Sequence, residues 1–67
     1  MRLYNRMLKV ITDHRTWITR RMIAVALSGG KHIAINPHHI IILSHMERDG
    51  VIEVRKVGVV YEYRRKA

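Results

Sequence analysis

The fold is predicted from residues 36–64, NPHHIIILSHMERDGVIEVRKVGVVYEYR. This stretch carries a helix with clear end signals, a glycine and two short strands, in that order. Asn36 is a good N-cap and Pro37 a good first helical residue, since proline lacks only an N–H that a helix leaves unpaired at this position. Gly50 can adopt the left-handed conformation that ends many helices. The sequence therefore predicts a helix that begins at Pro37 and ends before Gly50.

Beyond Gly50 the apolar residues alternate with polar ones, which is typical of strands that cover a core with one face. The inward-facing set is Ile52, Val54, Val59, Tyr61 and Tyr63. Two such runs close together along the chain predict a β-hairpin.

We expect a two-residue loop of Val57 and Gly58 to connect these strands, because a three-residue loop would set Ile52 against Glu62. The resulting cross-strand pairs are Val54 with Tyr61, Ile52 with Tyr63 and Glu53 with Glu62. The paired carboxylates do not predict a metal site, because Arg55 and Arg64 lie close enough to offset their charge.

Residues 2–14 carry apolar side chains at spacings of three and four, which predicts a first helix with one buried face. That face contains Leu3, Tyr4, Met7, Leu8 and Ile11. Trp17 and Ile18 then form a short apolar pair, which we expect to add a brief strand to the hairpin. A single tryptophan without aromatic neighbours is weak support for base stacking, so Trp17 is expected to anchor the core.

Thr19 is a suitable N-cap for a second helix, and Ser28 followed by two glycines ends it. Its expected buried face contains Met22, Ile23, Ala26 and Leu27. The following segment, SGGKHIAIN at residues 28–36, is longer than a tight turn, and Ile33 and Ile35 alternate in it as in a strand. Either these two isoleucines fold back over Ile41, Ile42 or both in the third helix, or Ile41 and Ile42 meet thymine methyls or another subunit.

With 67 residues the chain has room for one domain with a small core, burying about 60% of its unfolded surface. The absence of cysteine excludes disulfides and thiolate zinc sites and is compatible with a reducing compartment. No apolar run approaches the roughly 20 residues that span a bilayer. We therefore expect a soluble, cytoplasmic protein, in a cell or acting for a virus within its host.

The chain is strongly basic, with 13 Lys and Arg against 5 Asp and Glu, a formal net charge of +8 and a pI near 10.9. So high a positive charge on so small a body favours a polyanionic partner. Nucleic acid is the leading expectation, and an anionic membrane or an acidic protein are the alternatives. Charge alone does not choose between DNA and RNA.

Three stretches carry a resemblance to known proteins. ITRRMIAVAL, residues 18–27, resembles the first helix of many helix-turn-helix motifs, and RMLKVITDH, residues 6–14, matches the helix that precedes it. HMERDGVIEVR, residues 45–55, is similar to the end of the recognition helix and the start of the wing in winged-helix transcription regulators. The resemblance covers nearly the whole chain, although residues 28–36 depart from the usual tight turn.

The resemblance implies an α+β winged helix-turn-helix fold, with three helices and a C-terminal wing of two or three strands. Residues 1–67 would form one domain, with residues 64–67 as a basic tail. It further implies a small protein that binds double-stranded DNA, specifically or generally, and regulates transcription or replication, with its third helix in the major groove and its wing on the backbone. A homodimer is expected, since one such domain reads few base pairs.

The third helix is expected to bury Ile40, Leu43 and Met46, which leaves Ile41 and Ile42 facing the groove, against thymine methyls or another subunit. Basic residues at helix starts, in the loop, in the wing and in the tail are expected to hold phosphates. The candidate DNA-binding residues are Arg20, Arg21, Lys31, His38, His39, Ile41, Ile42, His45, Arg48, Arg55, Lys56, Arg64, Arg65 and Lys66.

The sequence offers little to support catalysis or a cofactor. The acids are scattered, cysteine is absent, and the glycine pair lacks the context of a phosphate-binding loop. His38 and His39 are neighbours and cannot share one helical face, so they do not predict a compact metal site. We expect a protein that is not an enzyme and holds neither metal nor cofactor.

Two other interpretations remain open. GGKHIAINPHHIIIL, residues 29–43, also resembles the FlbD-type flagellar small proteins, which implies a small β-barrel that regulates through RNA and makes residues 40–46 a strand. Alternatively, the apolar third helix indicates a winged-helix module that binds protein and has no DNA site.

Overall fold

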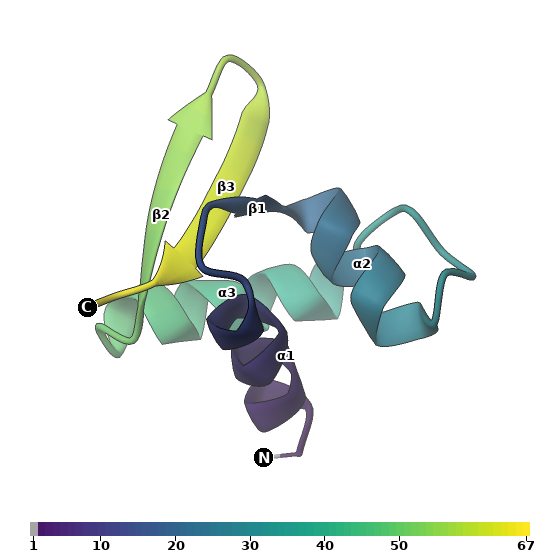
Figure 1. Ribbon diagram of the computed structural model, residues 1–67, viewed down its shortest axis with the longest axis horizontal. Helices are drawn as coiled ribbons and strands as arrows, with labels where there is room; N and C mark the ends of the chain where they lie inside the picture. The colour runs from purple at the N-terminus through teal and green to yellow at the C-terminus, as the bar shows by residue number, and fades with distance from the viewer. Residues whose placement is uncertain (1) are drawn as a thin grey trace.

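The computed structural model describes residues 2–67. Its helices and strands are α1 (Arg2–Asp13), β1 (Ile18–Thr19), α2 (Arg20–Ser28), α3 (Pro37–Arg48), β2 (Ile52–Val57) and β3 (Val60–Arg65). The strands form one antiparallel sheet in the order β1-β3-β2. The hairpin of β2 and β3 projects away from the three helices (Figure 1). The expected α+β class is confirmed, with three helices and a three-stranded sheet.

The bounds of α3 follow from the local signals in the sequence. The Asn36 side chain accepts a hydrogen bond from the backbone N–H of His38 at 2.8 Å, and Pro37 is the first helical residue. Gly50 follows the helix with a φ of 76°. Residues 40–46 are therefore helical, so the alternative β-barrel, which needs a strand there, is wrong.

The helix α2 begins as predicted but buries a different face. Thr19 accepts from the backbone N–H of Met22 at 3.2 Å and caps the helix. Ile23 and Ala24 are buried, whereas Met22 and Ala26 are exposed, so the prediction was wrong for the last two. At about 100° per residue the side facing α1 and the sheet holds residues 20, 23, 24 and 27, which also leaves Arg20 half-buried.

The connection at residues 29–36 is irregular rather than a strand. A strand needs a neighbour for its backbone groups, and the sheet ends at β1 and β2 without reaching this segment. Ile35 packs against the core, but Ile33 is 59% exposed and Ile41 is 53% exposed. The alternative in which both Ile33 and Ile35 cover the third helix is therefore wrong for Ile33.

The hairpin register differs from the predicted one by two residues. Val57 pairs with Val60, so the loop is Gly58 and Val59 rather than Val57 and Gly58. The physical reason is the turn: two-residue hairpin loops require a positive φ at their first residue, which glycine adopts freely and a β-branched valine does not. Gly58 has a φ of 62°, and no other residue described in the hairpin has a positive φ.

A shift of two residues keeps the paired strand residues on their predicted faces but changes their partners. The prediction that Val59 faces inward is wrong, because Val59 lies in the loop and is 88% exposed. The observed pairs are Ile52 with Arg65, Glu53 with Arg64, Val54 with Tyr63, Arg55 with Glu62 and Lys56 with Tyr61. The expected like-charge pair is thus replaced by two pairs of opposite charge.

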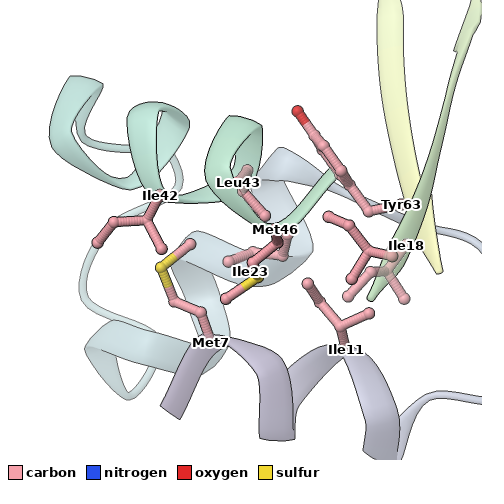
Figure 2. Packing of buried hydrophobic residues seen from close by; sticks show 9 residues of the cluster. Met7, Ile11, Ile18, Ile23, Ile42, Leu43, Met46 and Tyr63 are labelled. Atoms are coloured by element: carbon pink, nitrogen blue, oxygen red, sulfur yellow. The ribbon is translucent and has the colours of Figure 1, made fainter. Parts of the chain in front are cut away.

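Nine buried side chains form the core, and every helix and strand contributes at least one (Figure 2). They are Met7, Ile11, Ile18, Ile23, Ile42, Leu43, Met46, Ile52 and Tyr63. The prediction for the first helix is confirmed, since Leu3, Tyr4 and Leu8 pack against the edge of this cluster. The brief strand before α2 is also confirmed, with Ile18 opposite Tyr63.

Leu43→Ala tests this core. Leu43 is 1% exposed, and removing a fully buried leucine side chain costs about 2–5 kcal/mol of unfolding free energy. We expect urea unfolding, followed by circular dichroism, to show a loss in this range. Ser44→Ala is the matched control, because Ser44 lies on the exposed side of the same helix. Equal stability of Leu43→Ala and the wild type would contradict the packing of α3 described here.

Candidate nucleic-acid interface

One side of α3 is exposed to solvent and forms the first part of the candidate interface. Pro37, Ile41, Ser44 and Arg48 are exposed and share this side, given the helical repeat of about 100° per residue. Ile42 is only 1% exposed and points toward Met7 of α1 (Figure 2). The prediction that Ile42 contacts bases is therefore wrong.

The reason is the spacing of the α3 core residues. Ile42 lies four residues before Met46, so the two share one face, and that face is turned to α1 and α2. Ile40, predicted as core, is instead half-buried beside the hairpin. Leu43 and Met46 are buried as predicted, and Ile42 takes the place of Ile40, so the core stripe of α3 is rotated by about 50° from the predicted one.

The histidines of α3 divide between its faces. His38 is exposed and His45 is half-buried at the side of the outward face. His39 lies on the opposite side, and its Nδ1 is buried with no hydrogen-bond partner within residues 2–67. Burial lowers the pKa of His39, and the positive charges of His38 and Arg6 lower it further. The structure therefore separates His39 from the other candidates.

Arg20 and Lys56 come together on the inner face of the sheet around one aromatic ring. The Arg20 guanidinium carbon lies 4.1 Å from the centroid of the Tyr61 ring, and its Nε donates to the Tyr63 hydroxyl at 2.8 Å. The Lys56 Nζ lies 5.4 Å from the same centroid. A guanidinium stacked in this way keeps N–H groups at its edge available for an anion.

Arg20 borders a depression between α3 and the hairpin, which we call the α3–hairpin groove. It is lined by Arg20, Ile40, Leu43, Ser44, Glu47, Val54, Tyr61 and Tyr63. An adjoining hollow toward the tip of the hairpin is lined by Thr19, Arg20, Arg21, Val59, Val60 and Tyr61. Arg20 belongs to both, so the start of α2, the hairpin-facing side of α3 and the hairpin tip form one continuous surface.

Trp17 lies on the outer face of the sheet rather than in the core, so its prediction as a core anchor was wrong. Arg55 and Arg64 both stack on its ring, with guanidinium carbons 4.2 Å and 4.5 Å from the centroid. Arg55 Nε also donates to Glu62 and Arg64 Nε to Glu53, each at 2.7 Å. We call these five residues the outer-face network.

The outer-face network explains why Trp17 is not buried. The residue before β1 faces away from the core when Ile18 faces toward it, because side chains alternate along a strand. Both arginines stack on the indole, which leaves Trp17 half-buried. Arg55 and Arg64, both predicted to bind DNA, are thus held in contacts within the protein.

The basic C-terminal residues are not grouped at the hairpin tip. Arg65 belongs to β3 and pairs with Ile52, and the backbone N–H of Lys66 donates to the Val51 carbonyl at 3.0 Å. Both lie at the base of the hairpin, about 20 Å from the tip given six residues per strand. Arg64, Arg65 and Lys66 therefore do not form a single free tail.

Lys31 lies apart from the groove, in the irregular connection between α2 and α3. It is exposed and borders a surface cavity of about 700 Å³ that is also lined by Leu27, His32, Ile33 and His39. Of the predicted residues, the structure brings together Arg20, Arg21 and Lys56 around Tyr61, and Arg20 alone of them lines the groove beside α3. It separates Lys31, His39, Arg65 and Lys66 from them.

The groove cations carry no ion pair within residues 2–67. The three ion pairs of this part of the chain join Lys9 to Asp13, Arg55 to Glu62 and Arg64 to Glu53. Arg20, Arg21 and Lys56 take part in none of them. Glu47 is the single acid that lines the groove. Within residues 2–67, the side chains of Arg20, Arg21 and Lys56 are therefore not neutralised by an ion pair with a carboxylate.

Residues 2–67 contain no group of three or more histidine or acidic side chains placed to hold a metal ion. Within the same residues, no helix has the length and apolar character needed to cross a membrane. Comparisons with protein-family models, curated proteins and solved structures found no match to this chain.

Ser44, Glu47 and Tyr61 line the groove but were not among the residues predicted from the sequence. Ser44 and Glu47 are ordinary polar residues of a helix, and only the rotation of α3 shows which side they occupy. Tyr61 was predicted on the inner face of the hairpin, yet its contact with Arg20 joins residues 41 positions apart. No spacing rule along the chain signals such a contact.

The lowered pKa of His39 predicts a dependence of stability on pH. Below the usual pKa near 6.5 the unfolded chain takes up a proton that the folded His39 resists, so the unfolding free energy falls as the pH drops from 6.5 toward the lowered folded pKa. Denaturant unfolding between pH 7.5 and 5 measures this. The His39→Gln variant should lose less stability over that range, and an equal loss would contradict the assignment.

Proposed function

We propose that this chain is a small winged-helix protein that binds double-stranded DNA and regulates transcription or replication without catalysing a reaction. In this proposal the outward side of α3 enters the major groove. Arg20, Arg21 and Lys56 hold phosphates on either side of it. The protein would act inside cells, as the absence of cysteine favours.

The order of the elements supports the winged-helix part of the proposal. A helix, a short strand, two helices and a hairpin follow one another, and the short strand pairs with the second strand of the hairpin. This order is compatible with a winged-helix layout, in which α3 is the recognition helix and the hairpin is the wing. The long connection at residues 29–36 replaces the usual tight turn.

The single observation that carries the DNA-binding part is the position of the uncompensated cations. Arg20 and Arg21 are the first two residues of α2, where backbone N–H groups and the helix dipole also favour an anion. Lys56 approaches the same surface from the hairpin, across the ring of Tyr61. Three cations from two distant segments thus lie around Tyr61, and Arg20 among them lines the groove beside the helix that would read the bases.

One observation favours a second candidate function. Ile41 lies in the middle of the outward side of α3 and is 53% exposed, where a DNA-reading helix is usually polar. An apolar residue there also suits the surface of another protein, either a different partner or a second copy in a homodimer. The affinity for duplex DNA falls steeply with salt, whereas a protein that binds only another protein shows no salt-dependent duplex binding.

Duplex binding should weaken steeply with salt, because log affinity falls by about 0.9 per log unit of salt for each neutralised phosphate. Lys56→Gln should reduce the size of that slope by about 0.9. Fluorescence anisotropy of a labelled duplex, titrated at several salt concentrations, measures both values. Lys9→Gln is the matched control, since it removes the same charge from α1, away from the groove.

The outcomes separate the two candidate functions. A slope that falls in Lys56→Gln and not in Lys9→Gln supports phosphate contact at the hairpin. Equal slopes in both variants would contradict that contact. Absence of salt-dependent duplex binding by the wild type would overturn the DNA-binding proposal and favour the protein-binding module.

Arg48→Ala tests whether α3 reads bases. Arg48 is exposed in the last turn of α3, where loss of its charge costs only about 0.3–1 kcal/mol of stability. If it contacts a base edge, the variant should lose about 1–3 kcal/mol of binding free energy on a preferred duplex selected from a random pool, and much less on other duplexes. An equal loss on all duplexes would assign Arg48 to phosphate, and no loss would exclude it from the interface.

A further inference from the structure

The tip of the hairpin is apolar and uncovered. Val57, Val59 and Val60, which we call the valine tip, are 53%, 88% and 44% exposed. Gly58 supplies the positive φ that the turn requires, and Val59 has none. Loops of this kind usually carry Asn, Asp, Ser or Gly, because these residues suit the turn and the solvent. Nothing in the fold therefore calls for valine at position 59.

Exposed apolar clusters that contribute nothing to the core mark surfaces that a partner covers. The charges beside the valine tip identify the kind of partner. Arg20 and Arg21 line the same hollow as Val59 and Val60, and Lys56 precedes the tip in β2. Cations beside an apolar projection complement a polyanion that also has an apolar interior.

We propose that the valine tip enters the minor groove of duplex DNA and bends the duplex at a flexible pyrimidine–purine step. The inference rests on the proposed duplex-binding function and adds how the hairpin acts on the DNA. Apolar side chains inserted between base pairs partly unstack them and kink the duplex. The steps that unstack most easily are TA and CA/TG.

The dimensions of the hairpin fit this groove. Neighbouring strands lie about 4.8 Å apart, and the minor groove is about 6 Å wide and 7.5 Å deep, so a two-residue turn can enter it. A strand of six residues spans about 20 Å, while half a turn of DNA covers about 17 Å. With α3 in the major groove, the tip therefore reaches the adjacent minor groove.

Two other partners fit the valine tip less well. Segments that enter a lipid surface rely on Trp, Phe or Leu, and the tip contains none of these. A second copy of the chain would bring its own cations against Arg20, Arg21 and Lys56, and like charges repel. Duplex DNA offers both phosphates and an apolar interior of stacked bases, and apolar side chains enter that interior from the minor groove.

Bending of a labelled duplex tests the proposal. A 30-base-pair duplex carries a donor and an acceptor dye at its ends and one central TA step, and a second duplex has no pyrimidine–purine step near its centre. Wild-type protein should shorten the end-to-end distance of the first duplex more than that of the second. Val59→Ser should bind the first duplex about tenfold more weakly and leave it straight.

Two internal measurements keep the result interpretable. The salt slope of Val59→Ser should equal that of the wild type, because its Lys and Arg side chains remain. Its melting temperature should also be unchanged, because Val59 is 88% exposed. Ile33→Ser is the matched control: Ile33 is 59% exposed in the α2–α3 connection, and its replacement should leave binding and bending as in the wild type.

The failures of the two proposals are distinguishable. If Val59→Ser binds and bends the TA duplex as the wild type does, the valine tip does not enter the groove, while the duplex-binding function stands. If the wild type shows no salt-dependent duplex binding, the function itself is overturned, and this inference with it. If Val59→Ser loses binding to phosphatidylglycerol vesicles but keeps its duplex affinity, the tip belongs to a lipid surface and the inference is overturned.

Discussion

Burial of one small apolar cluster is the constraint on which the rest of this structure depends. All six elements contribute to it, and residues 2–67 bury no polar or charged side chain fully. A chain of this length is too short to build a second hydrophobic core, so its stability depends on this one. Each helix must therefore pack its apolar side against this one core. The polar side of each helix then faces the solvent in a direction set by that packing. The continuous surface of α2, α3 and the hairpin tip is the consequence on the outside of the molecule.

The hairpin shows how a local backbone requirement determines long-range contacts. Gly58 must be the first loop residue, because the turn needs a positive φ there. That requirement sets the register, and the register places Arg55 beside Glu62 and Arg64 beside Glu53 on the outer face. Both of these arginines also stack on the ring of Trp17. The side chains of the outer face thus connect the segment before β1 to the hairpin, while the inner face covers the core.

The division between the two faces sharpens the functional proposal. Charge alone favours a polyanion but gives no location, since 13 basic residues are spread along the whole chain. Within residues 2–67, Arg55 and Arg64 on the outer face form ion pairs with carboxylates. Arg20, which stacks on Tyr61, forms none. The same inner surface continues to the exposed valines of the tip. The proposed phosphate contact, base contact and groove insertion would therefore use neighbouring parts of one surface.

The sequence by itself determined the elements whose signals are local. Asn36, Pro37 and Gly50 mark the ends of α3, and alternation marks the two long strands, because capping and turn preferences act over a few residues. Only the tertiary structure decided which side of each helix is buried. Ile42 and Ile40 are equally apolar, and the approach of α1 determines that Ile42 enters the core. The contact of Arg20 with Tyr61 likewise depends on how the sheet packs against α2. Contacts between segments far apart in the sequence produce no periodic pattern of residues, so the sequence alone does not predict them.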